Sequence, residues 1–154
     1  MPRIEIKTQI KAPIQIVFDL ARNIDLHKLS TSQTNETAIA GKTSGLIDIG
    51  ESVTWRAKHF GFYQELTSRI TAFNSPNYFS DEMVSGIFKE FKHEHIFQEK
   101  NGITTMTDIF DYKSPFSILG RLVDILFLKA YMMSFLLKKN SVLKEYAERE
   151  IVIN

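Results

Sequence analysis

The chain has 154 residues, 44% of them hydrophobic and 24% charged, which fits one globular domain over residues 1–154 and excludes a disordered chain. Nineteen basic residues nearly balance 18 acidic ones, so no surface for nucleic acid is expected. The sequence contains no cysteine, which excludes a disulfide scaffold, a thiolate metal site and a cysteine nucleophile.

The N-terminal part predicts one strand followed by two short helices. Residues 3–11 alternate between apolar and polar side chains, which is typical of a strand. Ala12-Pro13 ends this pattern, and proline is tolerated in the first turn of a helix because its missing N–H would be unpaired there. Apolar residues at helical spacing then predict short helices over about 14–20 and 23–29.

The middle of the chain predicts antiparallel strands joined by turns. Strands with a period of two, the first of them weakly indicated, are expected over residues 34–40, 51–60, 62–73, 78–84, 87–99 and 103–112. Asn101-Gly102 predicts a tight hairpin, because both residues tolerate the positive φ angles of such turns. An antiparallel series of this kind buries one face and leaves the other in water.

The C-terminal part predicts one long helix that ends near Glu148. Its apolar stripe at helical spacing, which we expect to face the sheet, contains Leu119, Leu122, Val123, Leu126, Ala130, Met133 and Leu137. The opposite arc would be exposed, and it contains Ile125, Leu128, Met132 and Phe135 beside Arg121 and Asp124. Four interpretations of this arc remain open: a homodimer interface, a gate for a ligand, a peripheral membrane contact, or a surface covered by the first helices or by residues 41–50.

Neither a signal peptide nor a transmembrane segment is expected. The N-terminus has no long apolar run, and Arg121, Asp124 and Lys129 interrupt the apolar stretch 116–137. The expected compartment is therefore the cytoplasm.

The order of the elements resembles the helix-grip fold of the START and Bet v 1-like superfamily, also called SRPBCC proteins. The segments that carry this resemblance are 4–13, 53–57, 66–70, 81–88, 91–95 and the long last helix. It implies an α+β fold in which a curved antiparallel sheet of about six to seven strands is covered on its concave face by the C-terminal helix. Within the superfamily, the chain is most similar to a bacterial group of cyclase-like or uncharacterised proteins.

The resemblance also implies a ligand cavity, but no single reaction, because the superfamily includes lipid carriers, hormone receptors, polyketide cyclases and chaperone co-factors. The 12 phenylalanines fit such a cavity, since an aromatic surplus indicates a thick core or a lined pocket. The residues expected to face the ligand are Trp55, His59, Met83, Phe91, His93, His95, Phe97, Met106, Asp108, Phe110, Tyr112, Leu126, Ala130 and Met133.

His93 and His95 are the main candidates for chemistry. They are two residues apart and so point to the same face of one strand, and Asp108 is expected on the same face of the next strand. This group either orients a ligand, acts as a general acid and base, or forms a satisfied polar network within the core. Two imidazoles also suit a metal ion, but the spacing predicts no third ligand, so neither a metal nor another cofactor is expected.

The orientations of two further charged residues remain open. The alternation of the strand over 62–73 slightly favours a solvated Arg69, whereas an inward Arg69 would bind a carboxylate or phosphate. Asp81 and Glu82 point to opposite faces, so one of them faces inward, where its carboxylate would need a donor.

Three functions follow from these patterns. The first is binding of a hydrophobic small molecule such as a lipid, a polyketide or an aromatic metabolite. The second is a cyclase, dehydratase or hydrolase that uses His93, His95 and Asp108. The third is a module that contacts a protein or a membrane through the outer apolar arc of the last helix. Binding ranks first because it requires only the cavity.

Overall fold

The computed structural model of the protein describes residues 2–114 and 127–153, with side chains to residue 149. Within these ranges seven strands form one antiparallel sheet, in the order β1-β7-β6-β5-β4-β3-β2. The strands are β1 (Arg3–Ile10), β2 (Thr37–Gly41), β3 (Ser52–His59), β4 (Phe62–Asn74), β5 (Tyr78–Ser85), β6 (Glu90–Lys100) and β7 (Ile103–Lys113). The predicted curved antiparallel sheet is thereby confirmed, and β1 returns to pair with β7.

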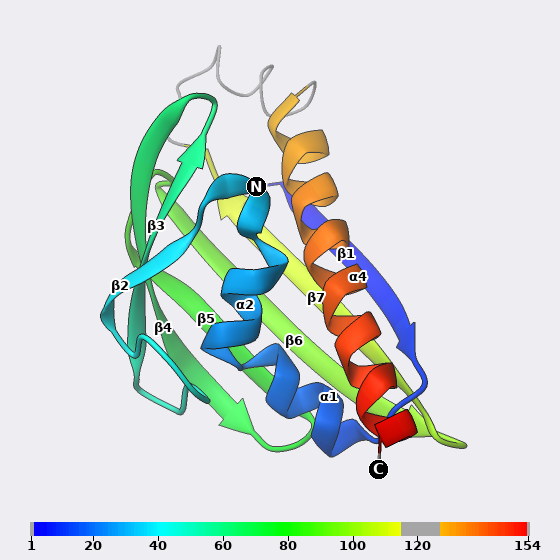
Figure 1. Ribbon diagram of the computed structural model, residues 1–154. Coiled ribbons are helices and arrows are strands. Elements are labelled where there is room, and N and C mark those ends of the chain that lie inside the picture. Colours follow the sequence, from blue (N-terminus) through cyan, green and yellow to red (C-terminus); the bar gives the residue numbers. More distant parts are fainter. Residues whose placement is uncertain (1, 115–126, 154) are drawn as a thin grey trace.

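The helices all lie on one face of this sheet, which curves around them (Figure 1). They are α1 (Ile14–Ala21), α2 (Ile24–Ser30), the short 3₁₀ helix η1 (Ser32–Thr34) and α4 (Lys129–Ile153). Asn23 separates α1 from α2, and its side chain accepts a hydrogen bond of 3.1 Å from the Leu26 amide, which caps α2. Figure 1 shows α4 running alongside β1 and β7, while α1 and α2 cross the remaining part of the concave face.

The alternation along β6 and β7 orients their side chains as predicted. The residues buried on the concave face are Phe91, His93, His95 and Phe97 of β6 and Met106, Asp108, Phe110 and Tyr112 of β7. The register places His95 opposite Asp108 and His93 opposite Phe110. The two strands are joined at Asn101 and Gly102, with φ angles of 54° and 78°, so the predicted hairpin turn is also confirmed.

The core has two parts, at opposite ends of the concave face. In the first, Phe18 of α1 is fully buried and meets Phe73, Phe79 and Phe97 edge to face, with ring centroids 5.3–5.4 Å apart. The second contains the aromatic residues Phe88, Phe91, Phe110 and Tyr112 together with Ile4, Ile6 and Leu136. Polar side chains that project from the concave face between these two parts therefore lie in apolar surroundings.

The prediction for the inner face of the last helix was wrong. Met133 and Leu137 are 36% and 50% exposed, and Ala130 is exposed too, whereas Leu136, Leu143 and Ala147 are buried. The expected outer arc is in fact the inner one. Leu128, Met132 and Phe135 pack against the second part of the core.

This reversal has a physical reason and a consequence. The first half of the helix is apolar on both sides, so helical spacing alone does not decide which side is buried. Leu128, Met132 and Phe135 face inward. These three residues therefore do not form the exposed surface that a dimer, a partner protein or a membrane would contact. Leu119, Leu122, Val123, Leu126, Ile125, Arg121 and Asp124 lie outside the described residues.

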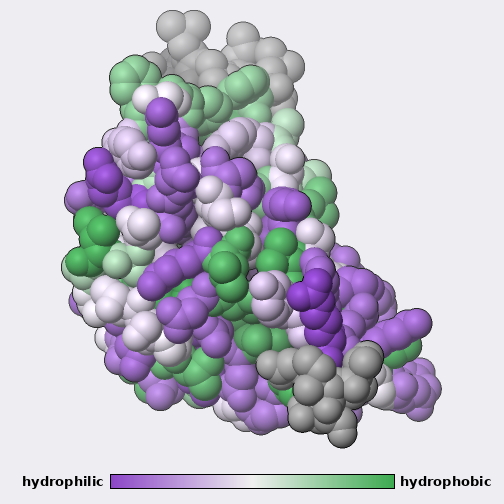
Figure 2. Space-filling model, viewed as in Figure 1, coloured by the Kyte–Doolittle hydropathy of each residue, from purple (hydrophilic) through white to green (hydrophobic). Residues whose placement is uncertain are grey.

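Apolar side chains are also exposed at the end of the molecule where the β3–β4 hairpin meets the start of α4. Phe60, Phe62 and Phe127 are 52%, 73% and 55% exposed. Figure 2 shows apolar surface at this end, next to the residues drawn in grey. In the part of the chain described here, no helix is both long and apolar enough to cross a membrane.

Candidate ligand-binding cavity

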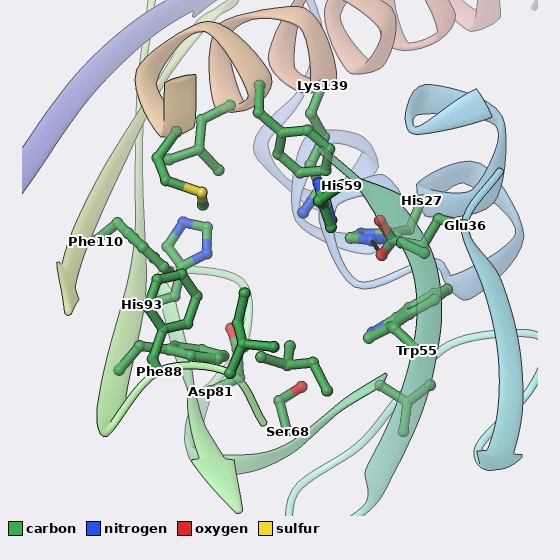
Figure 3. A pocket seen from close by; sticks show the side chains of 18 of the residues that line it. His27, Glu36, Trp55, His59, Ser68, Asp81, Phe88, His93, Phe110 and Lys139 are labelled. Carbon is green, nitrogen blue, oxygen red and sulfur yellow. Dashed lines mark hydrogen bonds and ion pairs between the residues drawn. The ribbon is translucent and has the colours of Figure 1, made fainter. Parts of the chain in front are cut away.

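A cavity of about 180 Å³ lies between the concave face of the sheet and the helices. Its apolar wall includes Leu66, Phe88, Phe91, Phe110, Leu128, Met132 and Phe135. The sequence contains four histidines, and all four line this cavity: His27, His59, His93 and His95. Figure 3 shows His93, Phe88 and Phe110 on one side of the space and His27, Glu36 and Trp55 on the other. Polar groups therefore face an otherwise apolar space from opposite walls.

The first polar group, which we call the β6 cluster, contains Asp81, His93, His95, Asp108 and Asn140. Asp108 Oδ1 lies 3.0 Å from His93 Nε2 and 3.0 Å from His95 Nδ1. Asp108 Oδ2 accepts a hydrogen bond of 2.7 Å from Asn140 Nδ2 on α4. The other nitrogen of His95, Nε2, lies 3.3 Å from Asp81 Oδ1 on β5. One buried carboxylate thus orients two imidazoles.

The protonation of the β6 cluster follows from these contacts. Burial opposes the charge on Asp108, but hydrogen bonds from both imidazoles, and their charge, hold the pKa of this carboxyl far below its ordinary value. Burial also opposes protonation of His95, but the hydrogen bonds to Asp108 and Asp81 and the charges of both carboxylates raise its pKa. Burial and the neighbouring His95 lower the pKa of His93. His93 is therefore neutral, and because an ionised carboxylate only accepts, His93 Nε2–H donates to Asp108 and Nδ1 remains an acceptor.

The second polar group, the α2 cluster, contains His27, Glu36 and Trp55. His27 Nε2 lies 2.6 Å from Glu36 Oε1, and the His27 ring stacks on Trp55 with a centroid distance of 4.1 Å. Burial, and then the positive charge of Lys139, lower the pKa of His27 despite the opposing effect of Glu36. Burial opposes the charge of Glu36, but the contact with His27 outweighs it and lowers the pKa of this carboxyl. The neutral imidazole donates to the ionised Glu36.

A third contact connects the hairpin end of β3 with α4. A hydrogen bond of 2.6 Å joins His59 Nδ1 and the hydroxyl of Tyr131, and the ring of Phe60 lies 4.6 Å from that of Tyr131. Burial lowers the pKa of His59 and raises that of Tyr131, so both groups are neutral. This contact holds the two sides of the cavity together at the apolar end of the molecule.

Two further polar side chains reach the cavity and lack a strong partner. Lys139 of α4 lines it, and among the ion pairs of the described residues none joins Lys139 to Glu36 or Asp81. Gln64 of β4 also lines it, and within the described ranges its buried Oε1 accepts no hydrogen bond. A buried acceptor without a donor costs about 1–3 kcal/mol, which a ligand with a hydroxyl or amine group would recover in part.

The structure divides the sequence-predicted site residues into four groups. Those that line the cavity are Trp55, His59, Phe91, His93, His95 and Phe110. Those that are buried or half-buried in the wall or core behind it are Met83, Phe97, Met106, Asp108 and Tyr112. Ala130 and Met133 are exposed on the outer side of α4, because the opposite face of the helix is buried. Leu126 lies outside the described residues.

Several cavity residues are missing from the sequence prediction, and some had a detectable pattern. Leu136 lines the cavity and belongs to a buried stripe with Asn140, Leu143 and Ala147, which recur every three or four residues and place Lys139, another lining residue, near the inner side. His27 follows Ile24 by three residues on the same helix face. Glu36 stands in a segment with no clear periodicity, so no pattern marks it. Of the two charges left open, Arg69 is exposed and Asp81 lines the cavity.

Comparisons with known proteins give structural matches only. No protein-family model and no curated protein matches the sequence. TTHA0849 from Thermus thermophilus is similar in structure, with a TM-score of 0.76 and 17% identity over 94% of this chain and 95% of that one. So is the Zhui aromatase/cyclase from a Streptomyces species, with a TM-score of 0.77 and 12% identity over 97% and 95%.

A plant protein has the same arrangement. The ginseng major latex-like protein 151 from Panax ginseng matches with a TM-score of 0.69 and 16% identity, over 95% of this chain and 97% of that one. Structural matches at identities this low establish a shared fold but not a shared activity. The seven-stranded curved sheet, the paired short helices and the long last helix therefore form the predicted helix-grip fold, which these solved structures share.

Proposed function

We propose that residues 1–154 act as one domain that binds a hydrophobic small molecule in the cavity between the concave face and α4. The observation that carries this proposal is the cavity itself, which has a largely aromatic and aliphatic wall. Protein interiors are normally packed as densely as organic crystals, and voids larger than a water molecule are few. A large apolar space lacks the contacts that water or side chains would supply, and a ligand restores them.

The size of the cavity limits the ligand. About 180 Å³ holds roughly a dozen waters at 10–15 Å³ each, which is the space of a molecule with two or three fused rings. At roughly 0.5 kcal/mol per non-hydrogen atom, a ligand of about 15 such atoms would bind with about 7–8 kcal/mol. This free energy corresponds to a Kd of roughly 1–10 μM.

The polar groups limit its chemistry. His93 Nδ1 and Gln64 Oε1 are acceptors in the cavity wall, and Lys139 is a donor. Phe88, Phe91 and Phe110 form an aromatic group in which the Phe110 ring contacts His93, and Figure 3 shows Phe88 and Phe110 on the same side as His93. A polyketide or another aromatic metabolite with hydroxyl and carbonyl groups fits this combination better than a purely aliphatic lipid.

A neutral apolar fluorophore tests the proposal. N-Phenyl-1-naphthylamine brightens in apolar surroundings, and Trp55 is the single tryptophan and lines the cavity, so energy transfer from Trp55 reports binding to the protein, and the variants below locate it. The variant Ser68→Phe places a large side chain into the cavity, whereas Arg69→Phe places the same side chain on the exposed face of the same strand.

The expected outcome is a micromolar Kd for the wild type and for Arg69→Phe, and at least tenfold weaker binding for Ser68→Phe. Far-UV circular dichroism checks that both variants fold. Equal binding by a folded Ser68→Phe protein would contradict the proposal. Native mass spectrometry of the untagged chain then gives the mass of any ligand that co-purifies.

A second candidate function is acid–base catalysis, favoured by the pair His93 and Asp108. The 3.0 Å contact between His93 Nε2 and Asp108 orients the imidazole, and Nδ1 remains to accept a proton from a bound molecule. The fold is shared with an aromatase/cyclase, although at only 12% identity.

Hydrogen–deuterium exchange tests this candidate without a known substrate. 2-Tetralone fits the cavity and carries acidic C–H bonds beside its carbonyl, so a base that removes a proton and returns a deuteron in D₂O changes its NMR spectrum. We expect exchange faster than in buffer alone, and loss of this acceleration in His93→Gln with 2-tetralone binding retained. Exchange at the buffer rate in the wild type would leave binding as the single proposed function.

A further inference from the structure

Three side chains of the β6 cluster converge on one point of the cavity wall. Asp81, His93 and His95 each offer one ligand atom, and these atoms all lie within 4.8 Å of one another. The register explains this convergence, because Asp81 of β5 pairs with His93 of β6, and His95 lies two residues further along on the same face. Figure 3 shows His93 and Asp81 directed toward the same part of the space.

We propose that Asp81, His93 and His95 bind one divalent transition-metal ion, such as Zn²⁺, at the edge of the cavity. Two imidazoles and one carboxylate are a donor set that binds Zn²⁺ and related ions in proteins. This inference goes beyond the binding of an apolar ligand and does not depend on it.

The distances suit such an ion. Two ligands of a tetrahedral ion with bonds of about 2.0–2.1 Å are about 3.3 Å apart. His95 Nε2 and Asp81 Oδ1 are 3.3 Å apart, which is long for a charge-assisted hydrogen bond but matches this tetrahedral edge. All three ligand atoms lie within 4.8 Å of one another, so modest side-chain rotations bring them to the tetrahedral separation of about 3.3 Å.

The surrounding hydrogen bonds suit it as well. Histidines that bind metals usually donate their other ring N–H to a carboxylate, which fixes the orientation of the ring. Asp108 is in this position for both imidazoles, at 3.0 Å from His93 Nε2 and 3.0 Å from His95 Nδ1, and Asn140 donates to it in turn. This leaves His93 Nδ1 and His95 Nε2 as the nitrogens available to an ion.

The charge of the cluster also favours a dication. Asp81 and Asp108 bring two carboxylates into a largely apolar interior, where a protonated His95 balances only one of them, and an uncompensated buried charge costs several kcal/mol. Lys139 lines the same cavity, but among the described residues it forms no ion pair with Asp81. A divalent ion balances both carboxylates, and three protein ligands leave a coordination position open toward the cavity.

Metal titration of the untagged full chain tests this proposal. The chain is treated with EDTA and dialysed, and Co²⁺ is then added while its visible absorption is recorded. Because the chain has no cysteine, the spectrum reports nitrogen and oxygen ligands only. Competition with Zn²⁺ follows, and mass spectrometry under native conditions gives the number of ions bound.

The four histidines supply matched variants. We expect one ion per chain, at least 100-fold weaker binding in His95→Gln and Asp81→Asn, and 10- to 100-fold weaker binding in Asp108→Asn, which disturbs the orientation of both rings. His27→Gln and His59→Gln change the other two cavity histidines and should bind within threefold of the wild type. If His95→Gln does not fold, Asp81→Asn still decides the result, because this side chain is partly exposed.

Two results would overturn the proposal. One is a folded wild-type chain that takes up neither Co²⁺ nor Zn²⁺. The other is an equal loss of metal binding in His27→Gln or His59→Gln, which would indicate unspecific uptake. Binding of N-phenyl-1-naphthylamine is measured on the same samples, so failure of the metal site and failure of the apolar ligand site are separate outcomes.

Discussion

On both sides of the cavity a buried imidazole lies next to a carboxylate, yet the two sides favour different charge states. In the α2 cluster, burial dominates and lowers the pKa of His27, which stays neutral beside Glu36. In the β6 cluster, His95 is even more enclosed, but its pKa is raised because two carboxylates contact its two ring nitrogens. The number of carboxylates in contact with the ring, rather than burial, separates the two cases.

The comparison also separates two kinds of function. A neutral imidazole with one partner, stacked on Trp55, is suited to positioning an apolar ring. A pair of imidazoles held by one carboxylate from behind, with a second carboxylate in front, is suited to holding a cation. The first three predictions each change one cluster and leave the other intact, and the fourth changes the contact between His59 and Tyr131.

The largest expected effect is that of Asp108→Ala. The substitution removes the acceptor of both imidazoles and of Asn140 and leaves these donors buried. Breaking a buried network of this kind costs about 3–5 kcal/mol of unfolding free energy. Urea denaturation of EDTA-treated protein measures it, and a loss below about 1 kcal/mol would show that water reaches this wall and solvates the freed donors.

The matching change on the other side is Glu36→Ala, with a smaller expected loss. One hydrogen bond to a neutral histidine is removed, which costs about 1–3 kcal/mol when the remaining donor is buried. The same urea experiment measures it. A loss as large as that of Asp108→Ala would mean that the two clusters contribute equally to stability, and the distinction drawn above would fail.

The third prediction concerns the pH dependence caused by His27. Its pKa is lowered in the folded protein, so below about pH 6.5 the unfolded chain takes up a proton that the folded chain does not. The folded state therefore loses stability as the pH falls, by up to about 1.4 kcal/mol per pH unit. Glu36, Lys139 and Asp81 are the charged groups that act on this ring.

The variant His27→Gln measures this contribution. Between about pH 7 and 5.5, above the range in which Glu36 titrates, we expect its unfolding free energy to fall less steeply than that of the wild type. His59 and His93 contribute with the same sign in both proteins, so the difference between the two slopes isolates His27. If the unfolding free energies of the wild type and His27→Gln change equally with pH, His27 is charged in the folded state. It would then not differ from His95 in charge.

The smallest expected effect is that of Tyr131→Phe at the third imidazole contact. His59 is half-buried, and the change removes one hydrogen bond between neutral groups, which costs about 0.5–1.5 kcal/mol. A decrease in Tm of a few degrees is expected. No decrease at all would show that water replaces the hydroxyl and that this end of the cavity is open to solvent.

The two roles considered for His93 exclude one another in any one molecule. As a metal ligand it uses Nδ1, the same atom that a general base needs. If exchange of 2-tetralone requires EDTA treatment, the metal inhibits catalysis; if EDTA abolishes exchange, the ion itself activates the C–H bond by polarising the carbonyl. Measuring exchange with and without EDTA therefore decides whether His93 acts as a general base or as a metal ligand.

Much of the fold was predictable because strands alternate with a period of two. Trp55, His93 and Phe110 face inward for this reason alone, and the Asn101-Gly102 turn aligns the neighbouring strands β6 and β7. The inner face of α4 was not predictable in the same way, because its first half is apolar all round and its position depends on what α1 and α2 leave uncovered.

The candidate site was predictable in part. His93, His95 and Asp108 follow from the alternation of two strands joined by a recognisable turn. Asp81 does not, because its place opposite His93 depends on the register of β5, and the adjoining β4–β5 pairing contains two irregularities that sequence does not reveal. Glu36 directly precedes the short strand β2 at the far edge of the sheet, where the sequence indicates a strand only weakly.

The position of every imidazole of this chain on one internal space has a practical consequence for spectroscopy. The histidine ring C–H resonances form a small, well-separated set in a proton NMR spectrum, and here none of them comes from outer surface loops. Any guest, ion or proton that enters the interior changes that set directly. The imidazole signals therefore report the occupancy of the whole interior, without isotope labelling and without knowledge of the guest.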